Sequence, residues 1–364
     1  MPGMYVGLMS GTSMDGIDAV LLTSHEGTPP ALRHHIHQPF PPQLRSTLLE
    51  LNQPGDNELH RAAMAANALA LGYAAAIRTL LAQARVTAEQ VTAIGCHGQT
   101  VRHHPEDGYT LQLVNGALLA ELTGIRVVCD FRSRDIAAGG EGAPLVPAFH
   151  RAVFAHPQRS RAIVNIGGIA NITWLPAQGE VAGFDCGPGN VLLDGWIMKH
   201  QNSPYDADGA WAAQGAPLPE LLERLLNHEF FDRHPPKSTG RETFHLRWIE
   251  SALSGQERPV DIQATLLALT AVGITRALDA YCPDATEIYL CGGGAHNRAL
   301  HEHIATLQPQ RRVSTTDELG IAVESVEAAA FAWLAECALT GKPGNLPRVT
   351  GARGPRILGA IYPA

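Results

Sequence analysis

Short apolar segments and glycine-rich turns open both halves of the chain. Residues 5–9 and 17–23 are apolar and flank the turn-forming stretch SGTSMDG, and residues 31–40 continue the pattern. This pattern predicts an N-terminal antiparallel meander. After residue 157 it starts again, because RAIVNIGGIANITWL predicts a strand, a glycine turn and a second strand. The two hairpins occupy similar places in the two halves, which suggests a duplicated architecture.

Helical and strand patterns alternate through the rest of the chain. Apolar residues recur at helical spacing over residues 59–84, 261–282 and 323–341. Apolar segments such as IRVVCDF and TEIYLCGGG lie between helices and predict strands. Strands that alternate with helices predict an α/β fold. Residues 201–242 are rich in proline, glycine and charge, which indicates a lid or a helical insert.

Length and composition are those of a globular protein. The chain has 364 residues, of which 45% are hydrophobic, and at roughly 150 residues per domain this length suggests two domains. The N-terminus lacks a signal-peptide pattern, and no apolar run reaches the length of a bilayer span. The six cysteines stand singly, as expected in a reducing compartment. These features predict a cytoplasmic protein without a membrane partner.

The charge balance argues against nucleic acid as a partner. Lys and Arg number 27 and Asp and Glu number 35, so the net charge is −8. A nucleic-acid backbone attracts a basic surface, which this composition does not favour. Aromatic residues make up only 6% of the chain, which leaves few platforms for stacked bases.

Three glycine-rich loops are candidate phosphate sites. The loop Ser10–Gly16 combines small residues with hydroxyl groups, and the loop Asn165–Asn171 joins two apolar strands. The loop Gly292–Asn297 joins a strand to a helix. The first loop lacks the lysine of a Walker A motif, and the third lacks the last glycine of a dinucleotide fingerprint. Ordinary hairpin turns are the alternative for the first two loops. Asp15 either holds Mg²⁺ through water or is a turn aspartate.

Two carboxylates are candidates for acid–base chemistry. Asp185 ends an apolar strand and begins the rigid loop CGPGN, a position that suits a general base. Its alternative role is to cap the helix that starts near Val191, although Asn190 fits that role better. Glu327 lies on a helix that is apolar around most of its circumference, so it needs a partner or a polar cavity. A structural ion pair is the alternative for Glu327, and Glu324 is expected to be the more solvated residue.

Two polar stretches follow predicted strands in the first half. They are CHGQTVR, which begins at Cys96, and DFRSRD, which begins at Asp130. Arg132 and Arg134 are suited to bidentate contact with an acidic group of a substrate. The nearby histidines lack the spacing of a zinc site, so no zinc is predicted.

Taken together, these blocks resemble the anhydro-N-acetylmuramic acid kinase family, nearly from end to end. The N-terminal block GLMSGTSMDGIDAV is highly specific by itself. It is followed, in the family's order, by CHGQTV, DFRSRDIAAGGEGAPLVP, NIGGIANIT, FDCGPGN, PPKSTGRE, LCGGGAHN, EAAAFAWLA and GNLPRVTGA. One departure is Cys186, where the resemblance leads us to expect a threonine or another small polar residue.

The resemblance implies an actin-like ATPase fold, in which two RNase H-like domains enclose a central nucleotide and substrate cleft. It divides the chain into an N-terminal domain (1–157), a C-terminal domain (158–345) and a tail (346–364) that packs back on the first domain. The implied activity is ATP-dependent opening of 1,6-anhydro-N-acetylmuramic acid with phosphorylation of O6. The product is N-acetylmuramic acid 6-phosphate, formed in peptidoglycan recycling. Mg²⁺ is the implied cofactor, and similar proteins suggest a homodimer.

The resemblance also assigns roles by position, with Asp185 as the general base and Glu327 as a second catalytic carboxylate. Residues implied to bind ATP and its phosphates are Ser10, Gly11, Thr12, Ser13, Met14, Asp15, Gly16, Ile17, Asp18, Asn165, Gly167, Gly168, Asn171, Gly292, Gly293, Gly294 and Asn297. Residues implied to bind the sugar are His97, Gln99, Thr100, Arg132, Asp135, Thr350 and Gly351. Asp15 is the candidate Mg²⁺ ligand, through water.

Two other functions are compatible with these residues. In an ordinary sugar kinase of the same fold, Asp185 would deprotonate a free hydroxyl group and no bond to C1 would break. A nucleotide-dependent regulatory or chaperone-like protein would need a peptide-binding or DNA-binding appendage, and the sequence shows no pattern for one.

Overall fold

The computed structural model describes residues 3–11, 14–25, 27–240 and 242–364, and the chain forms two compact units. The first unit contains residues 1–153 and 325–364, and the second contains residues 154–324. Residues 325–345, which the sequence analysis placed in the second domain, group with the first unit instead. The reason is that the helix in this stretch packs on the sheet of the first unit.

The first unit is built on a six-stranded sheet with the strand order β13-β7-β4-β1-β2-β3. The strands are β1 (Gly3–Met9), β2 (Gly16–His25), β3 (Thr28–Pro39), β4 (Ala93–Cys96), β7 (Val127–Cys129) and β13 (Ala360–Tyr362). β1, β2 and β3 form the predicted antiparallel meander, whereas β4 runs parallel to β1, and β7 runs parallel to β4. β13 comes from the end of the chain and pairs antiparallel with β7.

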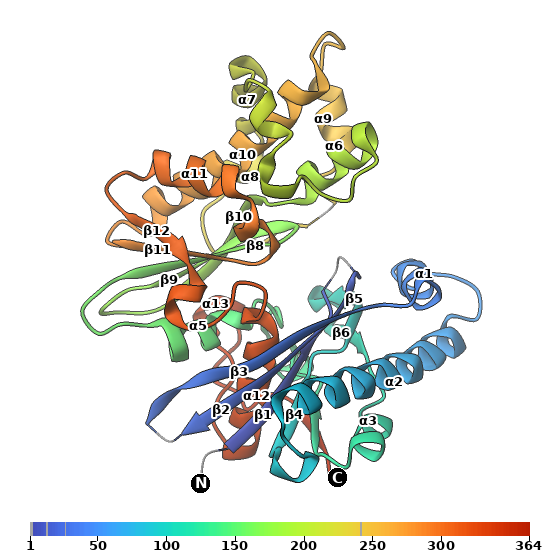
Figure 1. Cartoon of the computed structure of the whole chain (residues 1–364). Coiled ribbons are helices and arrows are strands. Elements are labelled where there is room, and N and C mark those ends of the chain that lie inside the picture. Colours follow the sequence, from blue (N-terminus) through green and yellow to red (C-terminus); the bar gives the residue numbers. More distant parts are fainter. Residues whose placement is uncertain (1–2, 12–13, 26, 241) are drawn as a thin grey trace. The chain divides into compact units, whose positions relative to one another are not determined.

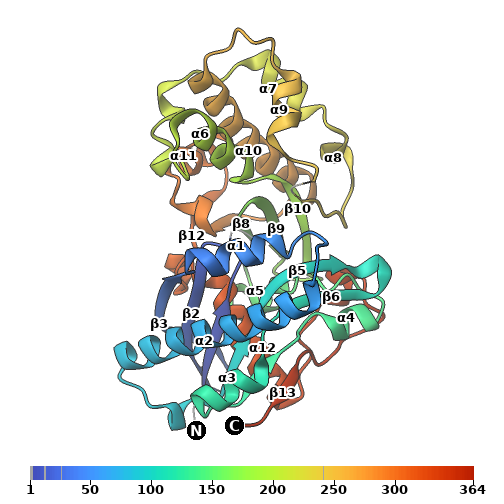
Figure 2. The same ribbon diagram turned by 90° about the vertical axis from the view of Figure 1, so that its right-hand side faces the viewer.

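Two long helices lie on opposite faces of this sheet (Figure 1). Val6 and Leu8 point to one face, where they share a core with α2 (Glu58–Ala84). Gly7 lies between them and faces α12 (Val326–Thr340), as the alternation of a strand requires. Figure 2 shows α3 beside α2. The other elements of this unit are α1 (Pro42–Glu50), α3 (Gly116–Thr123), α4 (Ser133–Ala137), α5 (Val146–Phe154), α13 (Pro347–Thr350) and the hairpin of β5 (Gln99–His104) and β6 (Tyr109–Leu113).

Two strand glycines allow α12 to lie directly on the sheet. Gly7 and Gly95 are partners on the adjacent strands β1 and β4. A Cβ atom on Gly7 would lie 1.9 Å from the carbonyl oxygen of Ala328, and one on Gly95 would lie 1.9 Å from that of Phe331. Both distances are far below van der Waals contact. The helix backbone therefore reaches this depth only because both strand positions lack a side chain.

The second unit repeats the strand order of the first in a five-stranded sheet, β10-β9-β8-β11-β12. Its strands are β8 (Arg161–Ile166), β9 (Ile169–Leu175), β10 (Ala182–Pro188), β11 (Glu287–Cys291) and β12 (Arg312–Thr315). Again the first three strands form a meander, and the next two follow in parallel beside the first. This RNase H-like order occurs in both units, which confirms the predicted duplication and the actin-like α/β fold class.

The helix α10 (Pro259–Tyr281) is the central helix of the second unit. It packs against β9, β10, α6, α7 and α11. The helices around it are α6 (Val191–Gln201), α7 (Pro219–Leu226), α8 (Glu229–Asp232), α9 (Leu246–Ala252) and α11 (Arg298–Leu307). The stretch 201–242, predicted as a lid or helical insert, contains α7 and α8.

Two helices bear on the expectation that no apolar segment could span a bilayer. By length and composition alone, α2 and α10 are long and apolar enough to do so. In α10, 83% of the most apolar window is buried inside the protein, and in α2 the share is 50%. Core helices pass the same test when they are buried, and both helices contribute to the cores described above.

We predict that Gly95→Ala lowers the free energy of unfolding by about 3 kcal/mol, because the new methyl group would overlap the carbonyl of Phe331 and force α12 off the sheet. Urea unfolding followed by circular dichroism measures the change. Gly55→Ala is the matched control, since a Cβ atom there would meet only the side chain of Arg61, at 3.5 Å. Equal stability of Gly95→Ala and the wild type would contradict the proposed close contact.

Candidate active site

The hydroxyl group of Ser10 was predicted to face a phosphate, but it forms hydrogen bonds to other residues of the first unit. Ser10 Oγ lies 2.8 Å from the hydroxyl oxygen of Tyr73 and donates to the carbonyl of Gly98 at 3.2 Å. The residue is buried. Ser10 therefore ties the end of β1 to α2 and to the loop after β4.

A backbone hydrogen bond links the two described residues Gly11 and Met14 of the first loop. The N–H of Met14 donates to the carbonyl of Gly11 at 3.2 Å, and Met14 has a left-handed backbone with φ of 54°. Asp15 is exposed at the start of β2, so its carboxylate is accessible to a hydrated cation. Thr12 and Ser13, also predicted to bind phosphate, lie outside the described residues.

Residues 16–18 belong to β2 rather than to the loop. A Cβ atom on Gly16 would lie 2.5 Å from the carbonyl oxygen of Gln38, so the strands approach closely here. The side chain of Ile17 is buried in the core, and its place in the ATP-binding stretch stays a prediction. Asp18 Oδ1 lies 2.9 Å from His37 Nδ1 on the neighbouring strand.

The structure brings together three of the predicted sugar and catalytic residues in the first unit. Arg132 donates from Nε and Nη2 to Nε2 of His97, at 3.1 and 2.9 Å, and from Nη1 to the carbonyl of Gly142 at 2.8 Å. His97 also lies against Phe331 of α12, with ring centroids 4.6 Å apart. Burial lowers the pKa of Arg132 to about 10, while the charge of Glu327 acts in the opposite direction. Burial and Arg132 hold the pKa of His97 well below its ordinary range.

These shifts fix the charges of the group at neutral pH. Arg132 stays a cation, and His97 stays neutral with the lone pair of Nε2 directed at the guanidinium. Glu327 is half-buried on the first turn of α12, and its charge acts on Arg132. A buried guanidinium of this kind is suited to bind a carboxylate of a ligand.

Asp135 and Thr350 are placed in a different environment. Asp135 is fully buried, and its Oδ1 accepts hydrogen bonds from Thr350 Oγ1 at 2.8 Å and Asn345 Nδ2 at 2.6 Å. Its Oδ2 accepts the N–H of Gly142 at 2.9 Å. This cluster joins α4 to the C-terminal tail, and the geometry does not support the predicted direct contact of Asp135 with a sugar.

The remaining predicted sugar residues are dispersed within the first unit. Gln99 is buried, and its Nε2 donates to the carbonyl of Gly11 at 3.1 Å. Thr100 Oγ1 accepts a hydrogen bond from Gln112 at 3.2 Å. Gly351 is exposed and ends α13 with φ of 79°.

In the second unit, Asp185 lies on the edge strand β10, at a bulge. Its Oδ2 accepts the N–H of Thr239 at 2.9 Å, and its own N–H donates to the carbonyl of Lys237 at 3.0 Å. Burial raises the pKa of Asp185 to about 6. The Thr239 N–H and the charge of Lys237 act in the opposite direction, and the charge of Glu242 raises the pKa further. A carboxylate with a pKa near neutrality is well matched to general-base chemistry.

The neighbours of Asp185 form hydrogen bonds elsewhere. Asn190 was expected to cap α6, but its side chain makes no capping hydrogen bond, and its Nδ2 donates to the carbonyl of Ile166 at 3.2 Å. Cys186, which stands where the resemblance leads us to expect a threonine or another small polar residue, donates from its thiol to the carbonyl of Ala170 at 3.3 Å. All six cysteines are buried thiols that form no disulfide bond.

The glycine loops of the second unit meet beside the strand that carries Asp185. The N–H groups of Gly189 and Asn190 donate to the carbonyls of Gly168 and Gly167, at 2.9 and 2.8 Å. Gly292 has φ of 77°, and a Cβ atom there would lie 2.2 Å from Asn165 Oδ1. The turn after β8 and the turn after β11 are therefore in contact, as a shared phosphate site requires.

The other members of these loops have different surroundings. A Cβ atom on Gly167 or Gly168 would meet nothing closer than 3.6 Å, so this turn has an open side. Asn171 is the register partner of Asp185 on β9. Asn297 caps α11, since its Oδ1 accepts the N–H of Leu300 at 3.0 Å.

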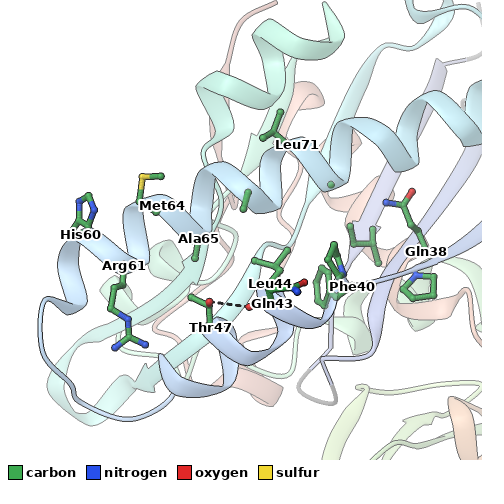
Figure 3. Close-up of a pocket in the computed structure, with 15 residues that line it drawn as sticks. Gln38, Phe40, Gln43, Leu44, Thr47, His60, Arg61, Met64, Ala65 and Leu71 are labelled. Atoms are coloured by element: carbon green, nitrogen blue, oxygen red, sulfur yellow. Dashed lines mark hydrogen bonds between the residues drawn. The ribbon is translucent and has the colours of Figure 1, made fainter.

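A separate groove of about 790 Å³ lies between α1 and α2 (Figure 3). Its lining is mainly apolar and includes Phe40, Leu44, Met64 and Leu71. Among the predicted site residues, only Ile17 contributes to it. The groove therefore does not coincide with the predicted catalytic residues.

Sequence reasoning assigned no role to Lys237 and Thr239, although both lie in the block PPKSTGRE. The structure places them directly against Asp185. The hydroxyl group of Thr239 is buried and has no hydrogen-bond partner within the described part of the chain. The block PPKSTGRE is the signal in the sequence that could have drawn attention to these two residues. Their contact with Asp185 could not be predicted from it, because the contact joins residues more than fifty positions apart.

The sequence matches a known family along nearly its whole length. Residues 3–364 match the family described as anhydro-N-acetylmuramic acid kinase. Over 362 residues the chain is 56% identical to the anhydro-N-acetylmuramic acid kinase of Nitrosomonas europaea, with 99% of each chain covered. Over 366 residues it is 50% identical to the protein of the same name from Pseudomonas syringae pv. syringae, with 100% of each chain covered.

We predict that Asp185→Asn raises the free energy of unfolding at pH 8 by about 1–3 kcal/mol. The folded-state pKa of about 6 lies above the value of an unfolded chain, so the wild type loses stability as the pH rises from about 4 to about 6. Urea unfolding at pH 4, 6 and 8 tests this. The gain should vanish near pH 4, where the carboxyl group is protonated in both states. The exposed Asp317→Asn serves as control, and a gain that does not depend on pH would count against a desolvated Asp185.

Proposed function

The chain belongs to the anhydro-N-acetylmuramic acid kinase family, and from that membership we propose how its residues perform the reaction. The enzyme opens 1,6-anhydro-N-acetylmuramic acid with water and transfers the γ-phosphoryl group of ATP to O6. The products are N-acetylmuramic acid 6-phosphate and ADP. The observation that best supports this chemistry is Asp185, a desolvated carboxylate held by one N–H in the unit that also carries two contacting glycine turns.

Asp185 acts as the general base. It takes a proton from a water molecule, whose oxygen bonds to C1 of the sugar as the C1–O6 bond breaks. The electron pair of that bond passes to O6, which attacks the γ-phosphorus of ATP, and ADP leaves. Asp185 then releases the proton to solvent. Positioning and charge stabilisation account for most of the catalysis in such a transfer.

The glycine turns supply the phosphate contacts. Backbone N–H groups around Gly167, Gly168 and Gly293 are suited to an anion, because a Cβ atom at these glycines would meet nothing closer than 3.6 Å. The N–H of Gly292, in contrast, donates to the carbonyl of Val323 at 3.0 Å. In the first unit, the turn closed by Gly11 and Met14 is proposed to have the same role.

The exposed carboxylate of Asp15 fits Mg²⁺, because this ion prefers oxygen ligands and keeps several of its waters. Asp15 would hold the ion through water. When bound, Mg²⁺ would neutralise charge on the phosphates of ATP.

The sugar is proposed to contact Arg132 and Glu327. The guanidinium of Arg132 is oriented by His97 and Gly142, and it suits the lactyl carboxylate of the substrate. Glu327 would accept hydrogen bonds from sugar hydroxyl groups. Asp135 and Thr350 would act indirectly, by holding the carbonyl of Gly142 in place.

The use of ATP and of a recycled cell-wall sugar supports a cytoplasmic location. We also propose that the enzyme forms a homodimer, because similar proteins suggest one.

We predict that Asp185→Asn lowers kcat by about 10²–10⁴-fold, because it removes the general base while the volume of the side chain stays the same. ADP release from ATP is measured with and without 1,6-anhydro-N-acetylmuramic acid, and nucleotide binding is measured by calorimetry. Binding should persist, and Asp317→Asn should behave like the wild type. Near-normal turnover of Asp185→Asn would refute the assignment of the base.

We further predict that oxygen from water appears at C1 of the product. The reaction is run in H₂¹⁸O for short times, and the product is analysed by mass spectrometry. Unlabelled N-acetylmuramic acid 6-phosphate incubated in the same water corrects for anomeric exchange. A product without label beyond this correction would indicate direct phosphorylation of a free hydroxyl group.

A further inference from the structure

Residues Lys237–Thr239 run beside the open edge of the strand that carries Asp185. β10 is the last strand of its sheet, so only one of its edges is paired with another strand. On its other side, the N–H of Asp185 donates to the carbonyl of Lys237, and the N–H of Thr239 donates to Asp185 Oδ2. One backbone–backbone hydrogen bond and one hydrogen bond from a backbone N–H to the carboxylate thus fix this segment beside Asp185. The segment belongs to the block PPKSTGRE, to which the proposed reaction assigns no role.

The side chain of Lys237 is held in an aromatic cradle. Its Nζ donates to the carbonyl of Phe230 at 3.2 Å and lies 4.6 Å from the centroid of the Phe230 ring. The ring of Tyr281, at the end of α10, lies 5.9 Å away. Aromatic faces attract a cation without neutralising it. The positive charge is thereby held on the segment that borders Asp185, and no described carboxylate forms an ion pair with it.

Among the described residues, few other charged groups act on this pair. Those that act on Asp185 are Lys237 and Glu242, which have opposite effects. The Cys186 thiol, Arg233 and Asp232 act on Lys237. Asp185 and Lys237 in turn have opposite effects on the pKa of the Cys186 thiol. Burial lowers the pKa of Lys237. Lys237 is therefore the one cation that counteracts the desolvation of Asp185 among the groups that the structure describes.

We propose that Lys237 is a positioning residue for Asp185, whose charge keeps this carboxylate ionised and ready to accept a proton. The Thr239 N–H holds Oδ2, and no described residue donates to Oδ1. Oδ1 is therefore the oxygen that receives the proton. The inference rests on the proposed function only for the step in which Asp185 acts as base.

The test compares Lys237→Met, which keeps the apolar stem, with Lys237→Arg, which keeps the charge. The matched control is Lys199→Met, because Lys199 also lies over an aromatic ring, that of Trp196 at 5.7 Å, but pairs with Glu250. The first measurement is the pH dependence of kcat/KM for 1,6-anhydro-N-acetylmuramic acid. The second is the titration of the Asp185 carboxyl carbon by NMR, assigned with Asp185→Asn. Thermal unfolding verifies that each variant folds.

Lys237→Met should move both the acidic limb of the pH profile and the NMR titration midpoint upward by about one pH unit. Lys237→Arg and Lys199→Met should leave both close to the wild type. An unchanged NMR midpoint in a folded Lys237→Met variant would overturn the inference. If the midpoint moves but the acidic limb does not, Lys237 acts on Asp185 as inferred, and the assignment of Asp185 as the general base is wrong.

Discussion

The close contact between α12 and the first sheet determines where the polar groups of the first unit lie. Gly7 and Gly95 are neighbours on β1 and β4, and backbone carbonyls of the helix occupy the space of the two missing side chains. At this depth Phe331 reaches His97, and His97 in turn orients Arg132. A packing constraint in the strands therefore places a buried cation at the end of the sheet. Stability and chemistry of this unit depend on the same two glycines.

The two units show how one scaffold can carry different chemistry. Both have the same strand order, and in both the first two strands pair antiparallel. In the first unit, the polar groups follow β4 and β7 and meet the start of α12, and they suit a carboxylate ligand. In the second unit, the turn after β8 meets the turn after β11, and the carboxylate is on the edge strand. An edge strand leaves one side open, and the segment with Lys237 occupies it.

Local pattern accounts for most elements of the fold and for part of the site. Alternation and turn residues predict the meander of the first unit and the hairpin of the second, and a strand-end position makes Asp185 a candidate general base. The pairing of β13 with β7 and the place of α12 in the first unit are contacts between distant residues, so no local pattern signals them. The resemblance implied that Asp135 binds the sugar, and the glycine-rich loop suggested that the Ser10 hydroxyl faces a phosphate. Only the fold shows that their partners are internal.

The contrast between Asp135 and Asp185 shows what separates a structural carboxylate from a reactive one. Asp135 is buried, but it accepts three hydrogen bonds from described residues, which use both of its oxygens and replace the water that it loses. Asp185 is also desolvated, but the described residues donate one hydrogen bond, to Oδ2. Incomplete hydrogen bonding raises the pKa of a buried carboxylate. A general base must still be ionised before it can accept a proton, so a nearby positive charge is needed to limit this rise. Lys237 provides that limit, so the segment along the edge strand belongs to the chemistry as much as the aspartate does.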